Sequence, residues 1–82
     1  MDIPGYDSLT EEERAVVDWQ YRRCGDFKEA LWRAIMYAND DNLELLRQGF
    51  PVEVDGYLRY SRENGWWASV TKKAGGDVEK GY

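Results

Sequence analysis

Side chains that could do chemistry are scarce in this sequence of 82 residues, and histidine is absent altogether. Without histidine, the Ser-His-Asp and Cys-His arrangements cannot be built, and no histidine can bind a metal. The chain contains neither GxxxxGK[ST] nor GxGxxG, so we expect no loop that cradles a phosphate. Most hydrolase mechanisms are excluded on these grounds, and a non-enzymatic protein is favoured.

One acidic pattern deserves inspection as a metal site. Asp40, Asn42 and Glu44 reproduce the opening alternation of a calcium-binding loop. The sixth position of that loop should be glycine and the twelfth a bidentate glutamate, but here they are Leu45 and Pro51. A helix cap followed by a solvated acidic face explains the pattern, and we expect neither a metal nor another cofactor.

Two further candidates for catalysis have ordinary explanations. Glu53 and Asp55 could serve as acid and base, but nothing in the sequence marks a pocket around them. Cys24, the single cysteine, is expected at a helix C-terminus, where the helix dipole raises the pKa of a thiol. We therefore predict no catalytic residue.

Residue types that dominate protein interfaces gather between positions 50 and 67. Trp, Tyr and Arg are enriched at binding hot spots, and the predicted protein-binding residues are Phe50, Tyr57, Arg59, Tyr60, Arg62, Trp66 and Trp67. Neighbours on a helix differ by about 100°, so Trp66 and Trp67 cannot both point inward. One of them is expected to face a partner, the C-terminal tail or another copy. The alternative is that Tyr57 and one Trp close the core while the others lie half-buried.

A nucleic-acid-binding accessory protein is the alternative function. Its candidate residues are cations interleaved with aromatic side chains, as in single-strand binders: Arg22, Arg23, Lys28 and Arg33. The formal net charge of −5 opposes general binding to phosphate backbones, and an acidic third helix offers no basic recognition helix. We therefore expect a protein partner, with a homodimer as one form of it, and not nucleic acid.

Length and composition limit the architecture and the compartment. The chain is long enough for one small domain, and four Trp, six Tyr and two Phe can supply a core without a metal or disulfide. A single cysteine excludes an intrachain disulfide and fits a reducing compartment. No apolar run approaches the roughly 20 residues of a membrane span. We predict a soluble protein of the cytoplasm, without membrane contact.

The elements that must position these residues are predicted to be helices. Thr10 and Glu13 form a capping box at the start of the first helix, Arg22 and Arg23 lie in its last turn, and Gly25 is its left-handed cap. Apolar residues at spacings of three and four mark the second helix as the core helix: Phe27, Ala30, Leu31, Ala34, Ile35 and Ala38, with Asp26 and Glu29 as its capping box and Trp32, Met36 and Tyr37 widening the arc. The alanines make one side thin, so that another helix could approach closely.

The second half of the chain is predicted to form three short helices. Residues 39–41 cap a helix over about 42–48, and a second over about 51–63 follows a hinge at Gly49-Phe50-Pro51. Gly56 in the middle of that helix indicates close approach by a neighbour, which we expect to be a tryptophan. An Asn64-Gly65 turn leads to a last helix over about 66–73.

The segment from Asp26 to Trp67 resembles small helical proteins encoded by bacteriophages and prophages. In those proteins an F-x-x-A-L-x-x-A-I helix is followed by D-x-x-N-L, G-F-P-x-E-V, Y-x-x-Y and G-[YW]-W. The matching residues here are Phe27, Ala30-Leu31, Ala34-Ile35, Asn42-Leu43, Gly49-Phe50-Pro51, Glu53-Val54, Tyr57, Tyr60 and Gly65-Trp66-Trp67. The resemblance covers about half the chain and implies an all-α fold and a phage or mobile-element origin, with no activity to transfer. Small acidic phage proteins often inhibit host machinery, including anti-defence proteins that mimic nucleic acid, but this is an analogy of class.

These observations lead to one prediction of fold and function. We expect an all-α, compact bundle of four to five short helices with flexible termini: an extended lead-in over 1–9, a helical domain over 10–73 and a disordered tail over 74–82. Ile3, Tyr6 and Leu9 of the lead-in are expected to tuck against the body. We expect the protein to bind a cellular protein through the fourth helix and the Trp pair, as a binder or inhibitor.

Overall fold

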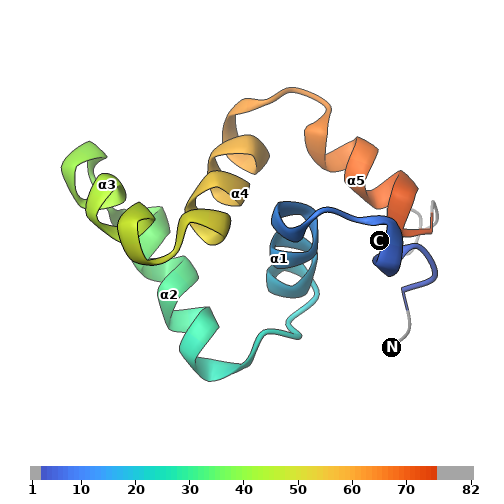
Figure 1. The fold of residues 1–82 in the computed structure, drawn as a ribbon, viewed down its shortest axis with the longest axis horizontal. Coiled ribbons are helices and arrows are strands. Elements are labelled where there is room, and N and C mark those ends of the chain that lie inside the picture. Colours follow the sequence, from blue (N-terminus) through green and yellow to red (C-terminus); the bar gives the residue numbers. More distant parts are fainter. Residues whose placement is uncertain (1–2, 76–82) are drawn as a thin grey trace.

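A computed structural model describes residues 3–75, and these residues form one 3₁₀ turn and five α-helices without any strand (Figure 1). In chain order the elements are η1 Tyr6–Ser8, α1 Glu11–Gln20, α2 Gly25–Tyr37, α3 Asp40–Gly49, α4 Pro51–Arg62 and α5 Trp66–Ala74. The all-α fold predicted from the sequence is confirmed.

Three helix starts are encoded locally, as predicted. The Thr10 hydroxyl accepts a hydrogen bond from the Glu13 amide at 3.2 Å, and the Glu13 carboxylate accepts one from the Thr10 amide at 2.8 Å. This reciprocal capping box starts α1. The Asn39 side chain accepts from the Asn42 amide at 2.8 Å and caps α3, while Pro51 is the first residue of α4.

The connection between α1 and α2 differs from the prediction. Helix α1 ends at Gln20, and the left-handed residue that closes it is Arg22, with a φ of 59°, instead of Gly25. The amides of Arg22 and Arg23 donate to the carbonyls of Trp19 and Asp18 at 3.1 and 2.7 Å, the two bonds of a Schellman motif. The two arginines therefore lie beyond the last turn of α1.

Helix α2 also begins without the predicted capping box. Gly25 keeps a left-handed φ of 82° but is the first residue of α2, and Cys24 occupies the N-cap position without a side-chain hydrogen bond. Asp26 and Glu29 lie inside the helix, because the Schellman motif ends α1 earlier in the chain than predicted and α2 already begins at Gly25.

Helices α1 and α4 form the centre of the molecule, and Gly56 lets them approach. A Cβ atom on Gly56 would lie 3.0 Å from Val16 Cγ2 and 3.2 Å from the Glu12 carbonyl oxygen. The predicted close neighbour of Gly56 therefore exists, but it is α1 and not a tryptophan. The buried apolar core around this contact consists of Ile3, Leu9, Val16, Val17, Leu31, Trp32, Ile35, Val54, Trp66, Val70 and Ala74.

The N-terminal segment packs on the end of α5. The Gly5 amide donates to the Ala74 carbonyl at 3.1 Å, and a Cβ on Gly5 would stand 1.7 Å from the Lys73 carbonyl oxygen, so only glycine fits. Ile3 and Leu9 are buried and Tyr6 packs against the core, as predicted. Ala74, placed in the tail by the sequence, is the last, buried residue of α5, and the rest of that predicted tail from 76 to 82 lies outside the described residues.

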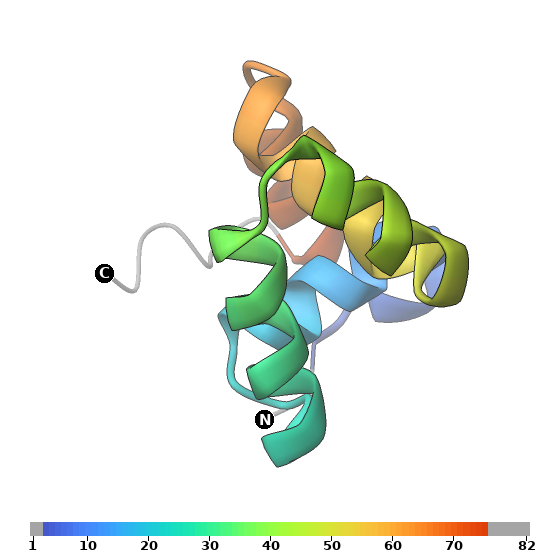
Figure 2. The same ribbon diagram turned by 90° about the vertical axis from the view of Figure 1, so that its left-hand side faces the viewer.

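Helices α2 and α3 lie at the opposite end of the molecule from α5 and the N-terminal segment (Figure 1). Helix α3 is joined to α4 through Phe50 and packs along it. In the view of Figure 2, α2 and α3 form the front of the molecule, and no other described helix lies over them. Their outward sides are therefore left to solvent.

Candidate interaction surfaces

Aromatic side chains from four helices or their ends meet at one side of the core. Trp19 stacks on Trp32 with ring centroids 4.5 Å apart and planes 6° from parallel, and Tyr60 approaches Trp19 edge-on at 5.3 Å. Trp67 continues the contacts at 5.6 Å from Tyr60 and 6.5 Å from Tyr21. We refer to Trp19, Tyr21, Trp32, Tyr57, Tyr60 and Trp67 as the aromatic cluster. Such pairs stabilise by about 0.5–1.5 kcal/mol each beyond their burial.

The structure brings three of the predicted protein-binding residues into this cluster. Tyr57, Tyr60 and Trp67 are all half-buried, and their rings contact other rings of the cluster. Trp66 points into the core with only 8% of its surface exposed. Of the Trp pair, Trp67 is therefore the member that reaches the surface, where it could contact a partner.

The other predicted residues lie apart from the cluster. Phe50 is 6.0 Å from Phe27, at the junction of α3 and α4. Arg59 is bound by carboxylates of its own chain, with Nε 3.2 Å from Glu12 Oε1 and 3.7 Å from Glu63 Oε2. Arg62 is exposed and lines a shallow depression between α3 and α4. The seven residues do not form a single continuous face, and their role in protein binding stays a prediction.

The cations of the nucleic-acid alternative are largely occupied by acids of the same chain. Three of the four form ion pairs: Arg22 with Glu29 at 3.7 Å, Arg23 with Asp18 at 3.8 Å and Lys28 with Glu53 at 2.5 Å. Only Arg33 lacks an ion pair with any residue that the structure describes. Because paired cations release fewer counterions, this surface is poorly suited to a phosphate backbone.

The buried carboxylates have structural partners. Burial alone would raise the pKa of Glu13, but hydrogen bonds from the Lys73 ammonium at 2.6 Å and from Thr10 outweigh it and lower that pKa. Burial, together with the nearby Glu29, raises the pKa of the Cys24 thiol, which opposes thiolate formation. Within residues 3–75 there is no group of three or more Cys, Asp or Glu that could hold a metal ion. The contacts of Glu13 with Lys73 and Thr10 stabilise the fold.

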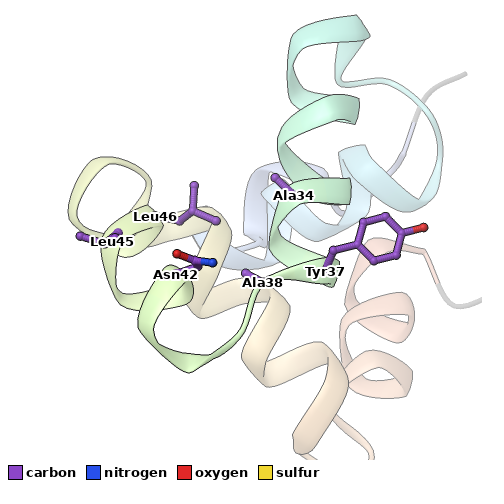
Figure 3. Close-up of a pocket in the computed structure, with 6 residues that line it drawn as sticks. All are labelled: Ala34, Tyr37, Ala38, Asn42, Leu45 and Leu46. Carbon is purple, nitrogen blue, oxygen red and sulfur yellow. The ribbon is translucent and has the colours of Figure 1, made fainter.

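The largest exposed apolar side chains lie on α2 and α3. Tyr37 is 82% exposed, Phe27 66% and Leu45 64%. An open depression of about 360 Å³ between the two helices is lined by Ala34, Tyr37, Ala38, Asn42, Leu45 and Leu46. Figure 3 shows Ala34, Ala38 and Asn42 between the two helices, with Leu45 on α3 and the Tyr37 ring directed away from α3. We call these six residues together with Phe27 and Ala30 the α2–α3 face.

Part of this face was predicted from the sequence to be buried in the core. Leu31, Trp32 and Ile35 are the α2 residues that point inward, whereas Phe27 and Ala34, predicted to share their stripe, are exposed. Residues at spacings of three and four can form two adjacent stripes, and α1 and α4 cover only one of them. The signal that could have found this face is the width of the apolar arc, which exceeds what one side of a helix needs.

No helix among the described residues combines the length and apolar character that crossing a membrane requires. Comparisons with protein-family models, with curated proteins and with solved structures found no match to this chain.

Proposed function

We propose that this protein is a non-enzymatic protein-binding module and that the α2–α3 face is its principal docking surface. The observation that carries the proposal is the exposure of Phe27, Tyr37 and Leu45 on two adjacent helices. Exposed apolar patches mark interaction sites in folded proteins. Aromatic residues are also enriched at interface cores.

The shape of this face suits a helical partner. Ala30 and Ala34 of α2 are exposed, and the half-buried Ala38 follows at the same interval of four as the residue that ends the helix. The separation of two packed helices, 8–10 Å, depends on the side chains at the contact. An alanine strip therefore favours close approach, as the sequence predicted, but the approaching helix would belong to another molecule.

The aromatic cluster is the second candidate surface, on the side where the sequence placed the interface. Tyr60 and Trp67 each keep part of their surface exposed, and both residue types are frequent at binding hot spots. Much of each ring is nevertheless used to join α4 and α5 to α1. This is why the α2–α3 face ranks first.

The proposed setting follows from the resemblance to phage and prophage proteins. A phage-encoded binder acts in the cytoplasm of its bacterial host, and its target would be a host protein, as for inhibitors of host machinery. The analogy extends no further than the class of partner.

Affinity capture with a matched pair of variants tests the proposal. Tagged protein is incubated with nuclease-treated bacterial lysate at low and at high salt, and retained proteins are identified by mass spectrometry. Ala34→Gln fills the depression at an exposed helical position, and Ala68→Gln makes the same change at an exposed position of α5. We expect a discrete protein that stays bound at high salt, is lost with Ala34→Gln and is kept with Ala68→Gln.

Two outcomes would overturn the proposal. Retention of the same partner by both variants would show that the α2–α3 face is not the interface. Retention of only nuclease-sensitive material, with binding that falls steeply with salt and on Arg22→Ala or Arg33→Ala, would favour the nucleic-acid alternative.

A further inference from the structure

The charges of α2 and α3 are unbalanced once internal ion pairs are counted. Their cations Lys28 and Arg47 are held by acids of α4, Glu53 at 2.5 Å and Asp55 at 2.8 Å. In contrast, Asp26, Asp40 and Asp41 are exposed and form no ion pair with any described residue. Arg33 is the one cation of these two helices that forms no ion pair with a residue in the described range 3–75.

These carboxylates border the α2–α3 face. At about 100° per residue, Asp41 lies on α3 beside Leu45, four positions later, and Asp26 lies beside the stripe of Phe27 and Ala30 on α2. Unpaired carboxylates thus border the apolar side chains on both helices, and on α2 the unpaired Arg33 lies on the same edge, seven positions after Asp26. A partner that covers the face is favoured if it carries cations at its edges.

The dimensions of the face match a short helix. The stripe on α2 extends from Phe27 to Ala38, which at 1.5 Å per residue is about 16 Å, or three helical turns. After Phe27 the stripe continues with the small residues Ala30, Ala34 and Ala38, and the larger Tyr37 and Leu45 border the depression that Ala34 and Ala38 line. An amphipathic helix recognised by such a groove uses anchors at positions i, i+3 or i+4 and i+7.

We infer that the α2–α3 face binds a basic amphipathic helix of a partner protein, with apolar side chains over Ala34 and Ala38 and with lysine or arginine facing Asp26 and Asp41. This inference rests on the proposed function and specifies its partner. A second copy of the chain fits the face less well, because it brings another net charge of −5 and the same unpaired carboxylates. A nucleic acid would be repelled by them.

Synthetic helical peptides test the inference directly. Three labelled peptides of about 16 residues, roughly four helical turns, share one leucine stripe and differ only in the flanking residues, which are lysine, glutamine or glutamate. Fluorescence anisotropy measures their affinity for the full chain. We expect the lysine peptide to bind at least about tenfold more tightly than the glutamate peptide, and Ala34→Gln to weaken the lysine peptide by about tenfold.

A charge-reversal pair isolates the electrostatic part. Asp41→Lys changes a first-turn acid of α3, and Glu11→Lys changes an exposed first-turn acid of α1, so net charge and helix-dipole effects are matched. We expect Asp41→Lys to weaken the lysine peptide about three- to tenfold and Glu11→Lys to leave it within about twofold.

Several results would overturn the inference. Equal affinity for the lysine and glutamine peptides, with no effect of Asp41→Lys, would remove the basic partner while leaving the face as a docking surface. An affinity for the lysine peptide that Ala34→Gln does not change would indicate non-specific electrostatic attraction. A dimer of the chain alone, dissociated by Ala34→Gln in light scattering, would make the occupant a second copy. Absence of binding by all three peptides would refute the helical partner, while the capture experiment with Ala34→Gln would still decide the proposed function.

Discussion

Replacing Gly56 with alanine is expected to destabilise this protein, although the same change stabilises most helix interiors by about 1 kcal/mol. The new Cβ would lie 3.0 Å from Val16 Cγ2 and 3.2 Å from the carbonyl oxygen of Glu12, both on α1. Val16 is fully buried and β-branched, and the carbonyl is backbone, so neither can turn aside. Overpacking of a core costs about 1–3 kcal/mol. After the gain in helix propensity is subtracted, the free energy of unfolding is expected to fall by about 1 kcal/mol, which lowers Tm by about 4–8 °C.

Gly49 provides the matched control for this measurement. It is the exposed last residue of α3, and a Cβ there would meet nothing within 4 Å. Gly49→Ala is therefore expected to raise the free energy of unfolding by a few tenths of a kcal/mol up to about 1 kcal/mol. Urea unfolding followed by circular dichroism compares the two variants with the parent. If both raised stability equally, α1 and α4 would not approach as closely as described, and the reasoning would fail.

Three other predictions concern single side chains. The folded-state pKa of Glu13 lies below its ordinary value of 4.5, so the unfolded state binds more protons between the two values. The stabilisation of the fold by ionised Glu13 is complete above about pH 4.5 and is lost as the pH falls through the folded pKa. The urea midpoint of the parent should therefore drop more on acidification than the midpoint of Glu13→Gln. Parallel dependence of the two midpoints on pH would contradict this prediction. The Cys24 thiol, whose pKa is raised by burial, should react with a disulfide reagent at pH 7 more slowly in the folded protein than in urea, and equal rates would argue against its burial. Trp67→Ala should lower stability by about 1–3 kcal/mol, because it removes edge-on contacts with two tyrosines; if the folded variant retained its partner fully in the capture experiment, the aromatic cluster would not be the interface.

Features that depend on neighbouring residues were predictable from the sequence. The cap at Thr10, the cap at Asn39 and the proline at the start of α4 each involve groups within four positions of one another. The same holds for the all-α fold, which follows from apolar periodicity. The α1–α2 turn was mispredicted because two left-handed residues, Arg22 and Gly25, occur close together, and glycine is the usual one of the two.

The identity of the residues that contact one another was not predictable in the same way. Periodicity indicated that Trp66 and Trp67 could not both be buried, but only the placement of α5 against the core decided that Trp66 is inside. Likewise, the glycine in α4 indicated a close neighbour without indicating that the neighbour is α1.

The sequence by itself determined that α2 is a helix with a broad apolar arc, since that property depends only on the spacing of its residues. The tertiary structure decided which part of the arc is covered. Helices α1 and α4 cover Leu31 and Ile35, whereas α3 packs onto α4 instead of lying over α2, so Phe27 and Ala34 stay exposed. Burial depends on contacts between segments far apart in the chain, and for that reason the candidate docking surface emerged only from the folded molecule.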